Sequence, residues 1–315
     1  MIRTLLLVTW LSSWLWARGA SLALAQDALG ETPQAAALGT WPEAHPPAGM
    51  TLHALLTGRS LARAAMAYSG GSFGEQRAFS QGAILIRHPA GNLLIDSGFG
   101  KDVDAHFRTV PWLIQKASAL QKLTPVGPQL RAAGIDPGKL FGVVLTHAHW
   151  DHVSGLADLE GVPVWTNQAE LDFIRSGHES AALARQLGLA SYRVYRFEGG
   201  PYLGFPRSHD VFGDGSVVLV PAPGHTPGSV VVFVSTPDGK HYALIGDMVW
   251  QREGIEQSVP KPWFVRGMVD VDPDATLGMI ERIHALKQRL PSLVVVPAHD
   301  ARVWQTLPSL PAAAR

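Results

Sequence analysis

The chain of 315 residues carries 26 basic and 26 acidic side chains, is 46% hydrophobic and 17% charged, and contains no cysteine. This size and composition can bury a substantial core, which excludes a disordered protein. The balanced charge argues against nucleic acid as a partner, and the missing cysteines exclude disulfide bonds and thiolate metal ligands.

The first 25 residues have the pattern of a secretory signal peptide. Arg3 gives a positive start, residues 4–17 are apolar, and Ala23–Ala25 before Gln26 fits a small-x-small cleavage site. A membrane anchor is the alternative, but Arg18 ends the apolar stretch short of the ~20 residues that a spanning helix needs. We therefore predict an exported protein, periplasmic or secreted, with no membrane attachment after cleavage.

The composition changes again near residue 50. Residues 26–50 are rich in Ala, Pro and Gly, which predicts a linker or N-terminal extension, and an apolar arm there would favour a homodimer. Residues 51–315 are predicted to form one domain. In it, short aliphatic runs that end at polar or glycine-marked turns predict buried strands within residues 83–88, 92–98, 142–147, 216–225, 229–234, 242–247 and 292–300. Helical spacing covers residues 168–176, 179–187 and 275–290.

Four of the predicted strands are followed by a residue that can bind a metal. His147 follows GVVLT, His225 follows VVLVPAPG, Asp247 follows YALIG, and His299 follows VVVPA. Loops at strand ends, held by a rigid sheet, are where sites are usually built. We therefore expect these side chains to belong to one site.

The densest polar cluster is HAHWDH at residues 147–152. His147 and His149 are two residues apart and can point the same way, while Asp151 and His152 come from the following turn, so the cluster can serve two centres. Neutral imidazole and carboxylate are the ligands that zinc accepts without cysteine, and a catalytic zinc keeps one position open for water. Isolated histidines are instead expected at the surface or in the core; they include His45, His88, His178 and His284.

The motifs THAHWDH, PGHTPGS, IGD and PAHD occur in this order and resemble those of the metallo-β-lactamase superfamily, from Leu52 to about Trp304. The resemblance implies an α+β fold, an αββα sandwich, with two divalent metal ions. Zinc is expected, and manganese, iron or cobalt remain open. Asp96 in LLIDSG matches an acidic position that supports a ligand histidine. By the same resemblance one ion has the ligands His147, His149 and His225, the other has Asp151, His152 and His299, and Asp247 bridges the two.

Hydrolysis is the reaction that such a pair of ions implies. The pKa of a shared water falls from 15.7 toward about 7, so a metal-bound hydroxide can attack at neutral pH while the ions polarise the substrate oxygen. Asp247 is expected to be catalytic through its bridging position, and Asp151 is expected to be catalytic as a ligand that also relays a proton.

Features that the sequence lacks narrow the class of substrate. No cysteine is available for the metal-binding cysteine of the best-known zinc β-lactamases, and Asp247 distinguishes the chain from the other β-lactamase branch. Little sequence follows His299 for the added domains of a glyoxalase II, a flavodiiron protein or an alkylsulfatase, and export argues against the tRNA-processing branch. The remaining resemblance is to dizinc quorum-quenching-type lactonases and exported organophosphate hydrolases. We predict a lactonase acting on an acyl homoserine lactone or related small ester, with organophosphate triester and then β-lactam hydrolysis as alternatives.

Residues near the motifs are candidates for the substrate pocket. Aromatic and methionine side chains could form an apolar wall, although core packing explains each equally well; they are Trp150, Trp250, Trp263, Phe264 and Met268. The resemblance to lactonases also implies a tyrosine that assists the substrate carbonyl, for which the candidates are Tyr192, Tyr195 and Tyr202.

Other classes of protein fit less well. Residues 70–74 match the GxSxG pattern of serine esterases, but their flanks supply no convincing strand. Residues 258–261 match SxxK, but Pro260 lies inside the pattern and the accompanying SDN and KTG are missing. A binding module stapled by metals would need closed coordination, whereas seven ligands shared over two ions leave positions for water and substrate.

Overall fold

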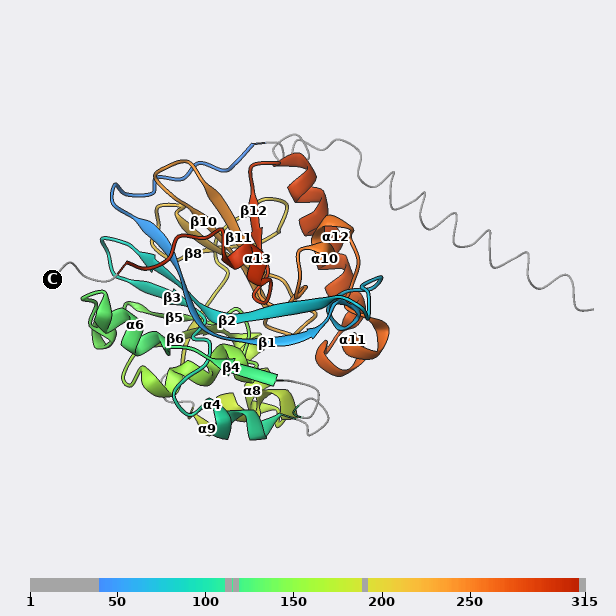
Figure 1. Cartoon of the computed structure of the whole chain (residues 1–315). Coiled ribbons are helices and arrows are strands. Elements are labelled where there is room, and N and C mark those ends of the chain that lie inside the picture. Colours follow the sequence, from blue (N-terminus) through green and yellow to red (C-terminus); the bar gives the residue numbers. More distant parts are fainter. Residues whose placement is uncertain (1–39, 111–114, 116–118, 189–191, 312–315) are drawn as a thin grey trace, which may run out of the picture. The chain divides into compact units, whose positions relative to one another are not determined.

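Two β-sheets packed face to face form the centre of the computed structural model, which describes residues 40–110, 115, 119–188 and 192–311 (Figure 1). The compact unit that contains them spans Pro42–Arg315. The predicted signal peptide and most of the predicted linker lie outside the described residues. Within the described ranges, none of the helices is long and apolar enough to cross a membrane.

The first sheet has seven strands among the described residues, in the order β4-β1-β2-β3-β5-β6-β7. They are β1 (Thr51–Arg63), β2 (Gln76–Arg87), β3 (Leu93–Ile95), β4 (Ala119–Lys122), β5 (Gly142–Val144), β6 (Val164–Asn167) and β7 (Tyr192–Tyr195). β1 and β2 form a long antiparallel hairpin, whereas β3, β5, β6 and β7 run parallel. The carboxyl ends of β3 and β5 therefore lie at the same edge of this sheet.

The second described sheet has the order β12-β11-β10-β9-β8. Its strands are β8 (His209–Asp210), β9 (Val217–Pro221), β10 (Val230–Ser235), β11 (His241–Leu244) and β12 (Val294–Val296). β10 is antiparallel to both β9 and β11, and β11 is parallel to β12. β9, β11 and β12 thus point the same way, so the loops that follow them leave the sheet at one edge.

The alternation of side chains along β2 shows why these strands are apolar on both faces. Ile84 and Ile86 belong to the core between the two sheets, and Ala83 and Leu85 belong to a second core beneath the helices of the outer face. Successive side chains of a strand point to opposite faces, so a sheet covered on both sides needs a continuous apolar run. This is the pattern that the sequence displays.

Helices cover the outer faces of both sheets (Figure 1). The α-helices are α3 (Ala64–Ala67), α4 (Val103–His106), α6 (Val126–Ala132), α7 (Trp150–Val153), α8 (Gln168–Arg175), α9 (Ala182–Gln186), α10 (Glu253–Glu256), α11 (Trp263–Val269), α12 (Pro273–Arg289) and α13 (Ala301–Trp304). Short 3-10 helices span Phe107–Thr109, Pro137–Lys139, Ser154–Asp158 and Glu179–Ala181. The longest described helix, α12, has Asp272 as its N-cap, whose side chain accepts a hydrogen bond from the Ala275 amide, with Pro273 in the first turn.

The αββα sandwich expected from the motifs is the observed architecture, and a strand forms within each of the seven predicted strand segments. The predicted helices at 168–176 and 275–290 form as α8 and α12, whereas residues 179–187 divide into a 3-10 helix and α9. β1 was not among the predicted strands, because its polar residues obscure the alternation. The GxSxG segment at residues 70–74 follows α3, not a strand, and so lacks the context of a serine nucleophile.

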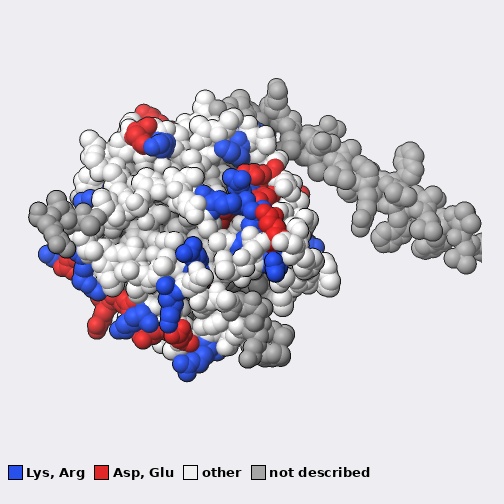
Figure 2. All heavy atoms as spheres, in the orientation of Figure 1, with Lys and Arg blue, Asp and Glu red and all other residues white. Residues whose placement is uncertain are grey.

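The face of the molecule drawn in Figure 2 carries basic and acidic side chains next to one another. Among the described residues, Arg77 and Arg302 both form ion pairs with Glu253, at 2.9 and 2.7 Å. The balanced composition of the sequence is therefore seen on this face as interspersed charges of both signs.

Candidate metal centre

The seven side chains predicted as metal ligands meet at the edge where β5, β9, β11 and β12 end. Their exposed fractions range from 1% for His147 to 9% for Asp151, so all are buried. Within each group the ligand atoms lie within 4.8 Å of one another. The groups are His147, His149 and His225; His147, His152 and Asp247; and Asp151, His152 and His299.

The local backbone explains how one short segment supplies four of these residues. After β5 the chain continues without regular secondary structure to His149, which is extended, with φ −72° and ψ 157°, and is the N-cap of α7. Asp151 and His152 lie in the first turn of α7. The change from extended chain to helix places them in a different group from His149.

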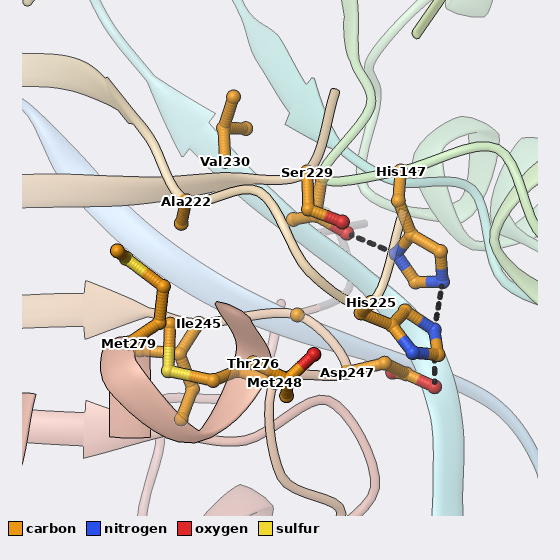
Figure 3. Close-up of a pocket in the computed structure, with 12 residues that line it drawn as sticks. His147, Ala222, His225, Ser229, Val230, Ile245, Asp247, Met248, Thr276 and Met279 are labelled. Atoms are coloured by element: carbon orange, nitrogen blue, oxygen red, sulfur yellow. Dashed lines mark hydrogen bonds and ion pairs between the residues drawn. The ribbon is translucent and has the colours of Figure 1, made fainter. Parts of the chain in front are cut away.

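The first group, here called the three-histidine half, consists of His147, His149 and His225. The Nε2 atoms of His147 and His225 are 3.2 Å apart, and the rings of His147 and His149 are nearly perpendicular with centroids 4.6 Å apart. Figure 3 shows the rings of His147 and His225 turned toward each other. Edge-on rings converging in this way can present several Nε2 lone pairs to one ion.

The second group, here called the carboxylate half, consists of Asp151, His152 and His299. Oδ2 of Asp151 lies 3.4 Å from Nε2 of His299 and 4.0 Å from Nε2 of His152. This half therefore combines two imidazoles with a carboxylate, which is a ligand set that zinc accepts.

Asp247 stands between the two halves. Its Oδ1 lies 3.1 Å from Nε2 of His152 and 2.9 Å from Nε2 of His299, while its Oδ2 lies 3.7 Å from Nε2 of His225. One carboxylate oxygen thus faces the carboxylate half, and the other also reaches the three-histidine half. The position matches the bridging role that the motif implied.

Hydrogen bonds to the outer ring nitrogens orient these histidines. Nδ1 of His152 donates to Asp96 at 2.8 Å, Nδ1 of His225 donates to Asp270 at 2.7 Å, and Nδ1 of His299 donates to a backbone carbonyl at 2.8 Å. A ring that donates through Nδ1 directs its Nε2 lone pair inward, which is the usual arrangement for a metal-binding histidine. The sequence prediction for Asp96 agrees with its contact to His152.

The buried polar atoms at the centre fit a bound cation. Nε2 of His149, Nε2 of His152 and Oδ1 of Asp247 are buried and have no hydrogen-bond partner among the described residues. A buried polar atom left unpaired costs about 1–3 kcal/mol. Because imidazole nitrogens and carboxylate oxygens are metal ligands, a divalent ion would offset this cost, and the residues present fit such an ion.

The two halves differ in protonation. Burial lowers the pKa of His147, His149 and His225, and neighbouring positive groups lower it further, so these rings favour the neutral form that binds metals. Burial also lowers the pKa of His152 and His299, but nearby carboxylates outweigh it and raise both pKa values above the usual range. The carboxylates responsible are Asp96, Asp151 and Asp247 for His152, and Asp247 and Asp151 for His299.

The centre has an apolar back wall. A cavity of about 10 Å³ lies behind His147, His225 and Asp247, and Figure 3 shows that Met248 and Met279 line it. The remaining lining includes Ala222, Val230 and Ile245. Such surroundings reduce the local dielectric and strengthen the interaction of charges at the centre.

Comparison with known proteins agrees with this geometry. Residues 77–299 match the metallo-beta-lactamase superfamily. The chain belongs to this superfamily. It is accordingly a metal-dependent hydrolase, and its sandwich is the metallo-β-lactamase fold.

Similar proteins in the superfamily include lactonases. The N-acyl homoserine lactonase AttM of Agrobacterium fabrum is 25% identical over 237 residues, which cover 72% of this chain and 84% of that protein. A solved N-acyl homoserine lactone hydrolase with N-hexanoyl-L-homoserine bound at its catalytic metal centre superposes with a TM-score of 0.67 at 20% identity, covering 83% of this chain and 97% of that chain. AidC, a dizinc quorum-quenching lactonase, has a TM-score of 0.56 at 15% identity, covering 82% and 90%.

The three candidate tyrosines are buried. Tyr192 belongs to the core under the outer helices, Tyr195 stacks on His209 with ring centroids 5.0 Å apart, and Tyr202 packs on Phe233 at 5.5 Å. A different aromatic residue lies at the centre, because Nε1 of Trp250 donates to Oδ2 of Asp247 at 2.9 Å. Its position three residues after Asp247 was the available sequence signal.

The other residues of the predicted apolar wall divide between core and surface. Trp150 stacks on Phe99 with ring centroids 5.3 Å apart. Trp263 and Met268 of α11 are 78% and 57% exposed. Of the proposed wall, Trp250 is the member with a direct contact to the seven clustered side chains.

Sequence analysis missed Glu170, which ties two loops of the centre together. Its Oε1 accepts from the amide of Ala148 at 2.6 Å, and its Oε2 accepts from Thr226 Oγ1 at 2.6 Å and from the amide of Gly228 at 3.0 Å. Ala148 lies between two clustered histidines, and Thr226 follows a third. The Glu170 side chain is 1% exposed, so this glutamate of an amphipathic helix joins the two loops as a buried hydrogen-bond acceptor.

Asp270 and Lys261 were also missed. Both are fully buried, and Lys261 Nζ contacts the same Asp270 oxygen that accepts from His225. The SxxK match that contains Lys261 pointed to a different chemistry, and no motif marked Asp270, which is 45 residues from His225 in the sequence.

Proposed function

We propose that this protein hydrolyses N-acyl homoserine lactones or closely related lactones, using two divalent metal ions, zinc in the first instance. The ligands are the three-histidine half, the carboxylate half and Asp247 between them. The convergence of both halves on Asp247 carries the proposal, because it provides for two ions sharing one carboxylate. The similar proteins named as N-acyl homoserine lactonases support the substrate class.

The ions, when bound, supply Lewis acidity and lower the pKa of water toward about 7. The chain's own residues provide the geometry. The indole N–H of Trp250 fixes the orientation of the Asp247 carboxylate, and the outer hydrogen bonds fix the imidazoles. Asp151 is the least buried of the seven at 9% exposed, so its carboxylate is placed to take up a proton from a group entering from solvent.

Proton release tests this proposal. The metal-loaded protein is given a long-chain N-acyl homoserine lactone, a simple δ-lactone, an aryl phosphotriester and a cephalosporin in parallel, and acid production is followed with a pH indicator. We expect the highest kcat/KM for the acyl homoserine lactone. Asp247→Asn should abolish this activity, while Asp238→Asn, at an exposed turn, serves as the matched control.

The outcomes separate the substrate from the metal centre. Fast phosphotriester or cephalosporin hydrolysis with inert lactones would contradict the substrate class and leave a dinuclear hydrolase. Full lactone turnover by Asp247→Asn, or by protein stripped of metal, would contradict the proposed centre itself.

We further propose that the chain is exported and cleaved after Ala25, on the strength of its first 25 residues. Mass spectrometry of the protein recovered from the cell envelope or medium should show an N-terminus at Gln26. An intact N-terminus on protein confined to the cytosol would contradict export.

A further inference from the structure

Lys261 is a fully buried cation next to the proposed centre. Its side chain is 0% exposed, and it ranks with phenylalanines and leucines among the largest fully buried side chains of the described residues. Lysine is almost never fully buried unless it is paired, because a desolvated charge is costly. A specific structural reason for this lysine is therefore to be expected.

The contacts of the ammonium group identify its main partner. Nζ of Lys261 lies 2.7 Å from Oδ1 of Asp270 and donates to the carbonyl of Met248 at 3.2 Å. It also lies 5.6 Å from the ring centroid of Trp250, within the range of a cation–π interaction. The ammonium group is thus contacted by a backbone carbonyl, an aromatic ring and the carboxylate of Asp270.

Asp270 passes this contact on to His225. The same Oδ1 that binds Lys261 accepts the hydrogen bond from Nδ1 of His225 at 2.7 Å, and the Asp270 side chain is 1% exposed. A buried carboxylate with no cation beside it would be an uncompensated charge with nothing to hold it in this position, and a displaced carboxylate would free the His225 ring. Lys261 holds the carboxylate in place.

The backbone around the ion pair is fixed as well. Lys261 precedes α11 and Asp270 is its C-cap, so the ion pair joins the two ends of this helix. The amide of Ser69 donates to the carbonyl of Pro260, and the hydroxyl of Ser69 donates to the carbonyl of Lys261 at 3.2 Å. The segment around Lys261 is therefore held both by the ion pair with Asp270 and by the hydrogen bonds from Ser69.

We propose that Lys261 is a positioning residue of the metal centre, which acts through Asp270 to hold His225 as a ligand of the three-histidine half. The inference rests on the metal centre of the proposed function and goes beyond it, because Lys261 itself touches none of the seven ligands. The role is also unrelated to SxxK chemistry, in which the lysine serves a serine nucleophile.

The test compares metal binding in Lys261→Met, Asp270→Asn and the double variant. Each protein is loaded with Co²⁺, its absorption spectrum is recorded, and the ions retained against a chelator are counted. We expect Lys261→Met to weaken retention of one of two ions by 10- to 100-fold, as for other residues that orient metal-binding histidines, and to change the spectrum. Lys287→Met is the matched control, because in the described structure that lysine donates to the backbone carbonyls of Pro291 and Leu293 and forms no ion pair with Asp270.

The double variant decides between positioning and general stability. If Lys261 acts through Asp270, the loss of metal affinity in the double variant should equal the loss in Asp270→Asn alone. Additive losses would overturn the proposal, and so would a Lys261→Met protein with the wild-type spectrum and retention. The comparison of Asp270→Asn with the double variant remains decisive if Lys261→Met alone fails to fold. A wild-type protein that binds no metal would instead refute the proposed function.

Discussion

The three-histidine half and the carboxylate half lie at the same edge of the sandwich but in opposite electrostatic surroundings. Burial and positive neighbours, Lys261 among them, lower the pKa of His225, and burial dominates for His147 and His149. In the other half, carboxylates raise the pKa of His152 and His299 despite burial. The pKa of the same side-chain type is thus lowered in one half and raised in the other.

The surroundings of the histidines, and not the type of ligand, therefore distinguish the two halves. A divalent cation gains more from nearby carboxylates than from neutral imidazoles alone. The outer partners follow the same division, since Asp270 is paired with the Lys261 cation whereas Asp96 accepts from Thr146 and His152. We therefore expect the two halves to hold their ions with different affinity.

The largest effect is expected where the halves meet. Asp247→Asn should lower kcat by more than the 10- to 100-fold typical of a residue that orients a ligand, because Asp247 faces both halves. Retained metal, measured by elemental analysis after dialysis, should fall, while the circular dichroism spectrum remains that of the folded protein. Loss of a single ion with unchanged kcat would show that the halves are independent.

The outer carboxylates should separate the halves. Asp96→Asn is expected to weaken the ion of the carboxylate half, and Asp270→Asn that of the three-histidine half, each by about 10- to 100-fold. Titration with chelators of graded affinity, using Co²⁺ as a spectroscopic probe, measures each loss. If both variants weaken the same ion, the assignment of the two halves is wrong.

A smaller effect is expected from Glu170, which braces the three-histidine half. Burial raises its pKa to about 7, against hydrogen bonds from Thr226, Ala148 and Gly228. The folded pKa exceeds the ordinary value of 4.5, so the contribution of Glu170 to stability is full below that pH and is lost as the pH rises through about 7. The free energy of unfolding of wild type should therefore exceed that of Glu170→Gln by about 1 kcal/mol at low pH, and this excess should shrink as the pH rises.

Urea unfolding of the metal-free proteins at about pH 5 and about pH 8, on either side of the raised pKa, measures this change. An excess that grows with pH would mean that the ionised carboxylate, with its three donors, is the stabilising form.

The smallest expected effect is on the stability contributed by Glu253, and it should change with pH in the direction opposite to that of Glu170. Glu253 lies behind the carboxylate half and binds Arg302 through both oxygens at 2.8 and 2.7 Å. Burial raises its pKa, but Arg302 and Arg77 outweigh burial and lower it. Glu253→Gln should cost up to about 1 kcal/mol at neutral pH, and the cost should vanish as the pH falls through the lowered pKa. Thermal melts across this pH range measure it, and a cost independent of pH would exclude the ion pair as its source.

Much of the candidate site followed from short-range pattern. His147, His225, Asp247 and His299 each stand just after an apolar run, and a strand that must be buried fixes where its polar loop begins. The prediction that Asp96 supports a ligand histidine came instead from the resemblance to the superfamily, and its contact with His152 agrees with it. The tyrosine candidates show the limit of this reasoning, because proximity along the chain could not choose among Tyr192, Tyr195 and Tyr202.

The sequence by itself determined the strands and the identity of the residues that meet at their ends, because apolar runs and ligand motifs are local properties of the chain, and the sandwich fold followed from the resemblance of those motifs to the superfamily. Only the tertiary structure decided which groups orient those residues. No motif indicated the roles of Glu170, Lys261 and Asp270 at the centre. Glu170 and Asp270 contact loops that are distant in sequence, and Lys261 acts through Asp270. Burying a charge without a partner is costly only in a packed interior. The partners of these three charged side chains are therefore decided by the folded structure and not by the local sequence.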